Sequence, residues 1–331
     1  MTTLWDTTGT AVVKALSAER RMAGSVSAGL ALTLVVVVEE ADVAAAEQAA
    51  TRAAAEHPCR LLLVVRRRPE AAESRLDAEV LIGGRLGPGE AVVMRMYGRL
   101  ALHAESVVLP LLAPDTPVVT WWATAPPDLI AHDPLGVLAH RRVTDTCLAD
   151  EPLAALRTRG ADYAPGDTDL AWTRTTSWRA LCAAAFDVVD ARPSAVRVGG
   201  AADHPGRALL AGWLGRRLGL AVDVRDEGSG IGWVEFDLPG AEAPLRIARA
   251  DERSATLTLP GAADRTLPLP ARDIGDLLAE ELRRLDPDEA YAEALEGATG
   301  LTGLSARPAT RTHVWHDPTE DPAPDPAITT S

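Results

Sequence analysis

Two apolar runs on either side of an alanine-rich segment constrain the fold of this chain more than any other feature. The runs are LALTLVVVVEE at residues 30–40 and CRLLLVV at residues 59–65, and both consist largely of branched aliphatic residues. Unbroken runs of this kind predict strands that are buried on both faces of a sheet. The segment between them, ADVAAAEQAATRAAAEH, contains strong helix formers. Together they predict a parallel β-α-β unit with a right-handed crossover.

The remainder of the first half extends this unit into an α/β layer. Thr7 and Thr8 are candidate caps for a first helix. RLALHAESVVLPLLAP predicts a helix that runs to Pro114. Four further strands are predicted from DAEVLIGG and EAVVMRMYG, joined by a turn around residues 87–89, and from PVVTWWA and RRVTDTC. We therefore expect an N-terminal α/β domain with a mostly parallel sheet over residues 1–165.

The second half has a different pattern, which follows a loose region at residues 157–168. Ser177 fits a helix N-cap, and helices are also predicted from PGRALLAGWLGRRLG, ARDIGDLLAEELRRL and PDEAYAEALEG. SAVRVGG, LAVDVRD, IGWVEFDLP, APLRIARAD and ATLTLPG predict short strands. Consecutive strands flanked by helices predict an α+β domain over residues 166–306. Residues 307–331 are rich in Pro, Asp and Thr, and we expect a disordered tail there.

Charge and cysteine content narrow the class of protein. The chain has 331 residues, a formal net charge of -14 and a pI near 5.0. This charge argues against nucleic acid as a partner, because nucleic-acid binders neutralise phosphates with clustered Lys and Arg. The longest apolar run is too short to cross a bilayer, so no membrane partner is expected. Cys59, Cys147 and Cys182 are widely spaced, which favours a reducing, cytoplasmic location.

The motifs of common enzyme classes are missing from the sequence. A Walker-type phosphate loop requires a lysine, and the only lysine, Lys14, lies in the first predicted helix. The glycine cluster GGRLGPGE lacks the dinucleotide-binding spacing, and no GxSxG motif occurs. His57 with Cys59, and His313 with His316, are too few to form a zinc site. We therefore predict no catalytic, cofactor-binding or metal-binding residue.

Four residues are instead candidates for contact with a partner protein. Trp121 and Trp122 lie at the carboxyl end of a predicted parallel strand, where open α/β sheets place their ligand crevice. Trp172 and Arg174 lie in the connection between the two predicted domains. Trp and Arg are enriched where binding energy concentrates at interfaces. Core packing, a partner contact and the floor of a small-molecule site remain open for the tryptophan pair.

Several segments carry a resemblance to a known family. EHPCRLLLV, SVVLPLLAPDTPVVTWWATAPP, DLAWTRTTSWRALCAAAFD and EELRRLDPDEAYAEAL resemble the glucose-6-phosphate dehydrogenase assembly protein family, called OpcA, of actinobacteria and cyanobacteria. The likeness runs from about Leu30 to Leu295 in matching order, and the Ala- and Arg-rich composition suits an actinobacterial member. The Pro-x-x-x-Trp-Trp strand and the Asp-Leu-x-Trp-x-Arg segment are its most specific markers.

The resemblance implies a non-catalytic subunit without a cofactor. Such a subunit binds glucose-6-phosphate dehydrogenase and promotes its active oligomer, which supports NADPH supply through the oxidative pentose phosphate pathway. Two alternatives remain open from the sequence. One is an enzyme acting on a sugar phosphate or lactone, and the other is a module that senses a metabolite.

Overall fold

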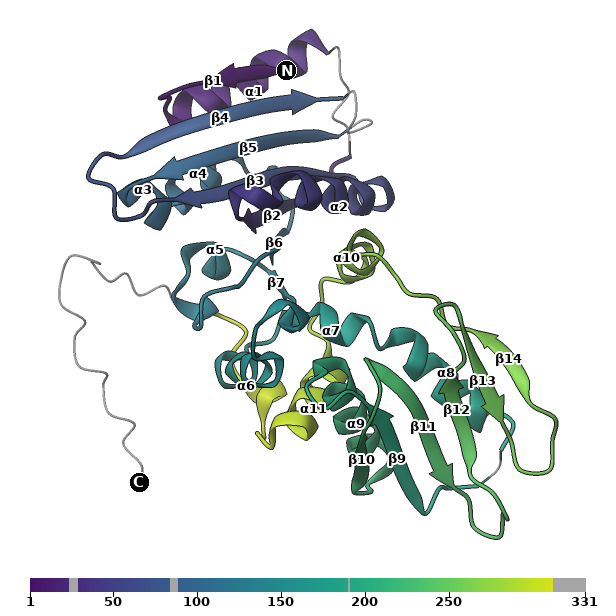
Figure 1. Ribbon diagram of the computed structural model, residues 1–331. Coiled ribbons are helices and arrows are strands. Elements are labelled where there is room, and N and C mark those ends of the chain that lie inside the picture. Colours follow the sequence, from purple (N-terminus) through teal and green to yellow (C-terminus); the bar gives the residue numbers. More distant parts are fainter. Residues whose placement is uncertain (24–28, 84–88, 190, 312–331) are drawn as a thin grey trace, which may run out of the picture.

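The computed structural model describes residues 1–23, 29–83, 89–189 and 191–311, which form two β-sheets joined by helices (Figure 1). The first sheet has eight strands and the second has six. Between the sheets lie α6 (Pro152–Asp162), α7 (Leu170–Thr173) and α11 (Glu289–Thr299). The predicted α/β class is confirmed.

The first sheet consists mainly of parallel strands. In chain order the strands are β1 (Thr2–Leu4), β2 (Leu32–Val38), β3 (Cys59–Arg67), β4 (Arg75–Ile82), β5 (Glu90–Tyr97), β6 (Val118–Trp122), β7 (Arg141–Thr144) and β8 (Asp167–Asp169). Their spatial order is β1-β4-β5-β3-β2-β6-β7-β8. The pairs β5–β3, β3–β2, β2–β6, β6–β7 and β7–β8 are parallel. The pairs β1–β4 and β4–β5 are antiparallel. The turn predicted around residues 87–89 lies mostly outside the described residues.

Helices cover both faces of the first sheet. On one face lie α1 (Gly9–Met22), α3 (Arg99–Leu102) and α4 (Glu105–Val108), and on the other lie α2 (Val43–Glu56) and α10 (Ile274–Arg283). Thr8 caps α1 as predicted, and its side chain accepts a hydrogen bond from the Ala11 amide at 3.3 Å. Because both faces are covered, every residue of β2 is buried, which explains its unbroken apolar run.

The helix predicted from Arg99 to Pro114 is wrong as a single element. The structure has α3, α4 and a 3₁₀ turn, η3 (Leu109–Leu111), in its place. Pro110 lies at the start of η3 and has no amide hydrogen to donate along a continuous helix. The other short elements are η1 (Glu40–Asp42), η4 (Ile130–His132), α5 (Pro134–Val137), η5 (Thr146–Leu148) and η6 (Leu304–Ala306).

The second sheet is mixed and has helices on one face, which confirms the predicted α+β architecture. Its strands are β9 (Ala195–Gly200), β10 (Val222–Asp226), β11 (Ile231–Asp237), β12 (Leu245–Arg249), β13 (Ser254–Thr258) and β14 (Arg265–Pro268). Strand β10 pairs parallel to β9 through helix α9 (Pro205–Leu218), and every other pair is antiparallel. Side chains of α9 and of α8 (Thr176–Phe186) share one apolar core with the sheet. Helix α8 begins before Ser177, because the Thr175 carbonyl already accepts the amide of Arg179 at 2.9 Å.

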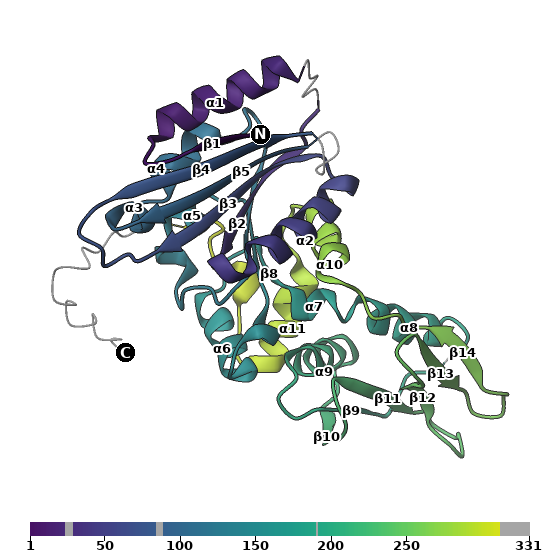
Figure 2. The ribbon, with the colours of Figure 1, turned by 45° about the horizontal axis from the view of Figure 1, so that its top comes forward.

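The two halves share elements across the predicted boundary. Residues 157–162, predicted as loose, form the end of α6, whose inward side holds Arg159 and Gly160 instead of an apolar stripe. Strand β8, beyond residue 166, completes the first sheet. Helix α10 also returns from the second half to pack on α2, as Figures 1 and 2 both show.

Part of the segment predicted as a tail is described by the structure. The Arg307 guanidinium donates to the carbonyls of Gly160 and Tyr163, at 3.1 Å each. Arg311 pairs with Asp162 at 3.2 Å. The chain is therefore held against α6 as far as Arg311, and residues 312–331 lie outside the described residues.

Candidate partner-binding site

A buried carboxylate organises the segment that carries two of the four predicted contact residues. Asp169 ends β8, and its side chain caps α7 by accepting the amide of Ala171 at 2.9 Å. It also accepts the hydroxyls of Thr144 at 2.7 Å and Thr146 at 3.0 Å. Complete burial, together with the negative charge of Asp145, raises the pKa of Asp169. Asp169 therefore holds α7 in place and is closed to solvent.

Trp172 lies inside the junction between the two sheets and is not on the surface. Its side chain is 1% exposed, and its indole N–H donates to Asp288 at 2.8 Å. The Arg179 guanidinium stacks 3.7 Å from the centroid of the indole ring, and the ring of Tyr291 lies at 6.2 Å. The indole thus joins α7 to α8 and α11.

Arg174 is the predicted contact residue that keeps access to solvent. Its guanidinium forms two parallel hydrogen bonds of 2.7 Å to Asp145, and its side chain is 28% exposed while that of Asp145 is 1% exposed. A bidentate pair of this kind fixes orientation as well as charge. Since Asp145 caps η5, Arg174 links the second half of the chain to the end of β7.

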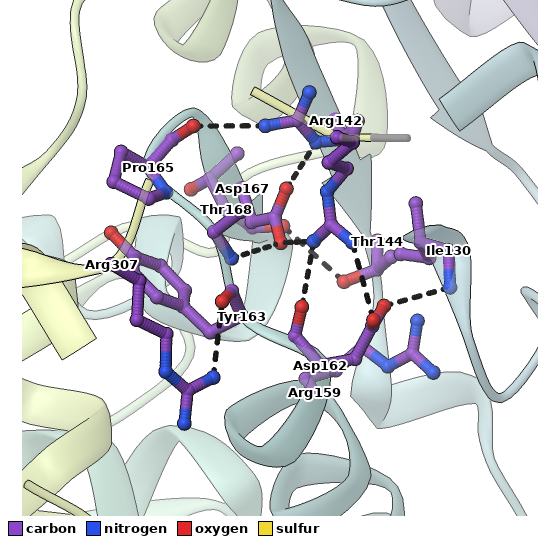
Figure 3. Close-up of polar contacts among 12 residues, drawn as sticks. Ile130, Arg142, Thr144, Arg159, Asp162, Tyr163, Pro165, Asp167, Thr168 and Arg307 are labelled. Atoms are coloured by element: carbon purple, nitrogen blue, oxygen red, sulfur yellow. Dashed lines mark hydrogen bonds and ion pairs between the residues drawn. The ribbon is translucent and has the colours of Figure 1, made fainter. Parts of the chain in front are cut away.

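A second polar cluster closes the other side of the junction. Figure 3 shows side chains of β7, β8 and α6 converging there, with Arg142 bound to Asp167 and Asp162 accepting the amide of Ile130 at 2.7 Å. Arg141 and Thr173 both bind the buried carboxylate of Glu281 on α10. The junction is therefore fixed by charged groups that are paired in its interior.

Trp121 and Trp122 point to opposite faces of the first sheet, as their positions on one strand require. Trp121 packs in the core beneath α2 and α10, and Trp122 packs in the core beneath α1 and α4. Their exposed fractions are 3% and 1%, and neither indole N–H has a hydrogen-bond partner among the described residues. Trp121 also lines a crevice of about 410 Å³ at the carboxyl end of β6.

Element η5 lies between two of the predicted positions, Trp121 and Arg174. Leu148, at its end, is 53% exposed and lines the same crevice as Trp121 and Ala125. Asp145, at its start, holds Arg174. We call Ala125, Leu148 and Arg174 the η5 patch. Leu148 lies on no periodic segment, so the sequence pattern gives no sign of it, and only its exposure at the crevice identifies it.

All three cysteines are buried or partly buried. Burial raises the pKa of the Cys59, Cys147 and Cys182 thiols to about 12, and Asp145 contributes at Cys147. Because the thiolate is the nucleophile, these thiols are unreactive at neutral pH. No group of three or more metal-ligating side chains occurs within residues 1–23, 29–83, 89–189 and 191–311. In the same ranges, no helix has both the length and the apolar character needed to cross a membrane.

Comparisons with known proteins give matches to both halves of the chain. A family model described as "Glucose-6-phosphate dehydrogenase subunit N-terminal domain" matches residues 50–161, and its C-terminal counterpart matches residues 165–295. A curated relative from Synechococcus elongatus, "Putative OxPP cycle protein OpcA", is 29% identical over 212 residues. The aligned region spans 60% of this chain but only 44% of that relative.

One solved structure shows a distant similarity. It is UDP-N-acetylglucosamine 3-dehydrogenase GnnA from Acidithiobacillus ferrooxidans, which aligns with 82% of this chain and 96% of its own. The sequence identity is 12% and the TM-score is 0.32, so the similarity does not bear on fold or function.

Proposed function

This chain belongs to the OpcA family of glucose-6-phosphate dehydrogenase assembly proteins, and from that premise we propose that it is a non-catalytic, cytoplasmic subunit of the dehydrogenase. It binds glucose-6-phosphate dehydrogenase, favours the active oligomer and so supports the oxidative pentose phosphate pathway. The observation that carries the proposal is the match of two subunit domain models in consecutive order. The low reactivity of its thiols is consistent with a role in binding.

The mechanism is a shift of population between assemblies of the dehydrogenase. A subunit that binds the active assembly more tightly than the inactive one moves the equilibrium by that difference in affinity. Such binding needs a surface with a fixed shape, and the paired charges at the junction provide one. We place the contact at the η5 patch, with exposed Leu148 at its centre and Arg174 beside it.

The three buried tryptophans contribute to this contact indirectly. Trp121 supports the crevice that Leu148 lines, and Trp172 holds α7 next to Arg174. Trp122 stabilises the opposite face of β6. In this proposal their substitution weakens binding through the fold, whereas substitution of an exposed patch residue weakens it directly.

Leu148→Asp tests the proposed contact. A carboxylate in a desolvated contact centre is expected to weaken the complex roughly 10-fold or more, which corresponds to about 1.4 kcal/mol. Leu109→Asp is the matched control, because Leu109 is 52% exposed and also lies in a 3₁₀ element. It lies on the face of the first sheet that α1 and α4 cover, away from the η5 patch. Light scattering gives the mass of the complex, and the turnover of the dehydrogenase is measured in the same samples.

The same samples separate the proposed function from the proposed contact. If wild-type chain changes neither the mass nor the turnover of the dehydrogenase, the proposed function is wrong. If both Asp variants bind as tightly as wild type, only the η5 patch is wrong. Conversion of a sugar phosphate or lactone by the isolated chain would favour the enzyme alternative.

A further inference from the structure

A second, larger cleft lies in the second half of the chain and shares only Arg174 with the η5 patch. Its volume is about 830 Å³, within the range of small-molecule sites. It lies beyond the carboxyl end of β9, where the chain enters α9, and the start of α8 and the end of β12 complete its walls. Strand β9 has a parallel neighbour on one side and an antiparallel neighbour on the other. Ligand crevices form at such changes of direction beyond the carboxyl ends of strands.

His204 presents a hydrogen-bond donor to this cleft. Its Nδ1 accepts the amide of Arg207 at 3.2 Å and so caps α9. Burial and the charge of Arg174 lower the pKa of His204, so the ring is neutral at neutral pH. With Nδ1 as the acceptor, the proton resides on Nε2. Nε2 lies toward Gly230, another residue that lines the cleft.

Arg249 supplies a positive charge that no carboxylate neutralises by direct contact among the described residues. It donates to two backbone carbonyls, those of Asp251 at 3.3 Å and Leu269 at 3.2 Å, and it lies 5.6 Å from the ring of Trp178. The other two arginines of the cleft are paired, Arg174 with Asp145 and Arg272 with Glu280.

The remaining polar side chains of the cleft are two hydroxyls and two carboxylates. The hydroxyls of Ser177 and Ser229 line it. Two carboxylates also line it: Asp251, which accepts the amides of Arg253 at 2.7 Å and Ser254 at 2.8 Å, and the exposed Glu252. The Arg249 guanidinium, on which the charge of Asp251 acts without an ion pair among the described residues, can bind the acceptor oxygens of a phosphate group together with the neutral His204 N–H and the two serine hydroxyls.

We propose that this cleft binds a phosphorylated small metabolite, with the phosphate held by Arg249 and His204 and the remainder of the molecule over the apolar wall of Leu269 and Pro270. Arg174 lines the same cleft and also holds Asp145 beside the η5 patch. Binding of the metabolite in the cleft therefore changes the position of Arg174 in the η5 patch. Through Arg174 it changes the affinity of the chain for the dehydrogenase. This regulatory step rests on the proposed function, whereas the binding itself does not.

Calorimetry of the isolated full chain tests the site. We expect saturable one-to-one binding of glucose 6-phosphate, weaker binding of inorganic phosphate, and none of glucose. Arg249→Gln should weaken the binding of glucose 6-phosphate at least 10-fold. Arg225→Gln is the control, because Arg225 is an exposed arginine on β10 outside the cleft, and it should bind as wild type does.

A second variant keeps the test independent of folding. His204→Asn retains a good N-cap for α9 but removes the Nε2 donor, and several-fold weaker binding is expected. Wild-type affinity in a folded His204→Asn or Arg249→Gln variant, or no saturable binding of either phosphate compound, would overturn the proposal. Since no dehydrogenase is present, this failure is distinct from failure of the proposed function.

Discussion

Trp172 shows how one side chain in this protein combines several structural roles. Its ring packs against Tyr291 and Arg179, and its N–H satisfies the Asp288 carboxylate. Asp288 in turn caps α11 by accepting the amide of Tyr291 at 3.0 Å. Trp172, which belongs to a sequence marker of the family, is therefore a structural residue at the junction. It stabilises the fold without direct contact with a partner protein.

Trp172→Phe is expected to lower the free energy of unfolding by about 1–3 kcal/mol, because it removes the indole N–H that donates to the partly buried Asp288 carboxylate. Trp5→Phe is the control, since Trp5 is 68% exposed, and no measurable change is expected there. Urea titration followed by circular dichroism measures both variants. An unchanged midpoint for Trp172→Phe would mean that another donor replaces the indole.

At the scale of elements, local pattern predicted most strands and helices but not their partners. The apolar runs of β2, β3 and β6 identified them, because both of their faces are buried. Strands β1, β8 and β14 were missed: β1 and β8 have three residues each and β14 has four, and β8 is the polar segment Asp167–Asp169. Such a strand is defined by long-range pairing and by buried hydrogen bonds, which periodicity does not reveal.

The candidate site was predictable only in part for the same reason. The Trp–Trp and Trp–x–Arg segments located β6 and α7, but their contacts depend on the distant residues Asp145, Glu281 and Asp288. An isolated carboxylate in a sequence gives no sign that folding will bury it against an arginine. The exposure of Leu148 likewise depends on how the folded chain packs around it, so the sequence pattern does not predict it.

The contact between α9 and α11 gives a prediction at this scale. Gly212 meets the backbone of α11 so closely that an added Cβ would lie 2.3 Å from the Ala294 carbonyl oxygen. Gly212→Ala is therefore expected to separate the helices and cost about 1–3 kcal/mol, despite the higher helix propensity of alanine. Gly9→Ala is the control, because a Cβ added at Gly9 of α1 would lie 3.7 Å from its nearest neighbour, the Val107 side chain of α4. Thermal unfolding should show a lower midpoint for the first variant only.

At the scale of the whole molecule, the two sheets are not independent units. Helix α10 contributes Leu277, Leu278 and Leu282 to the core of the first sheet, and its Asp276 pairs with Arg52 on α2 at 2.7 Å. Strand β8 also lies beyond residue 165. The predicted boundary at residue 165 separates the two halves of the sequence, whereas the core of the first sheet contains residues from both halves.

A fragment of residues 1–165 tests this coupling. Without β8 and α10 it exposes the apolar face of α2, so we expect binding of a hydrophobic dye and no cooperative thermal transition. The full chain should unfold in one transition. Cooperative unfolding of the fragment, with the dye unbound, would show that the first sheet is complete without these elements.

The return of α10 also sets an order of events during synthesis. Helix α2 is translated early, but the helix that covers it is encoded more than two hundred residues later. At ordinary elongation rates the ribosome needs about 10–40 s to reach it. Throughout that interval the alanine face of α2 stays uncovered in the nascent chain, and the core of the first sheet is completed only after α10 has emerged from the ribosome.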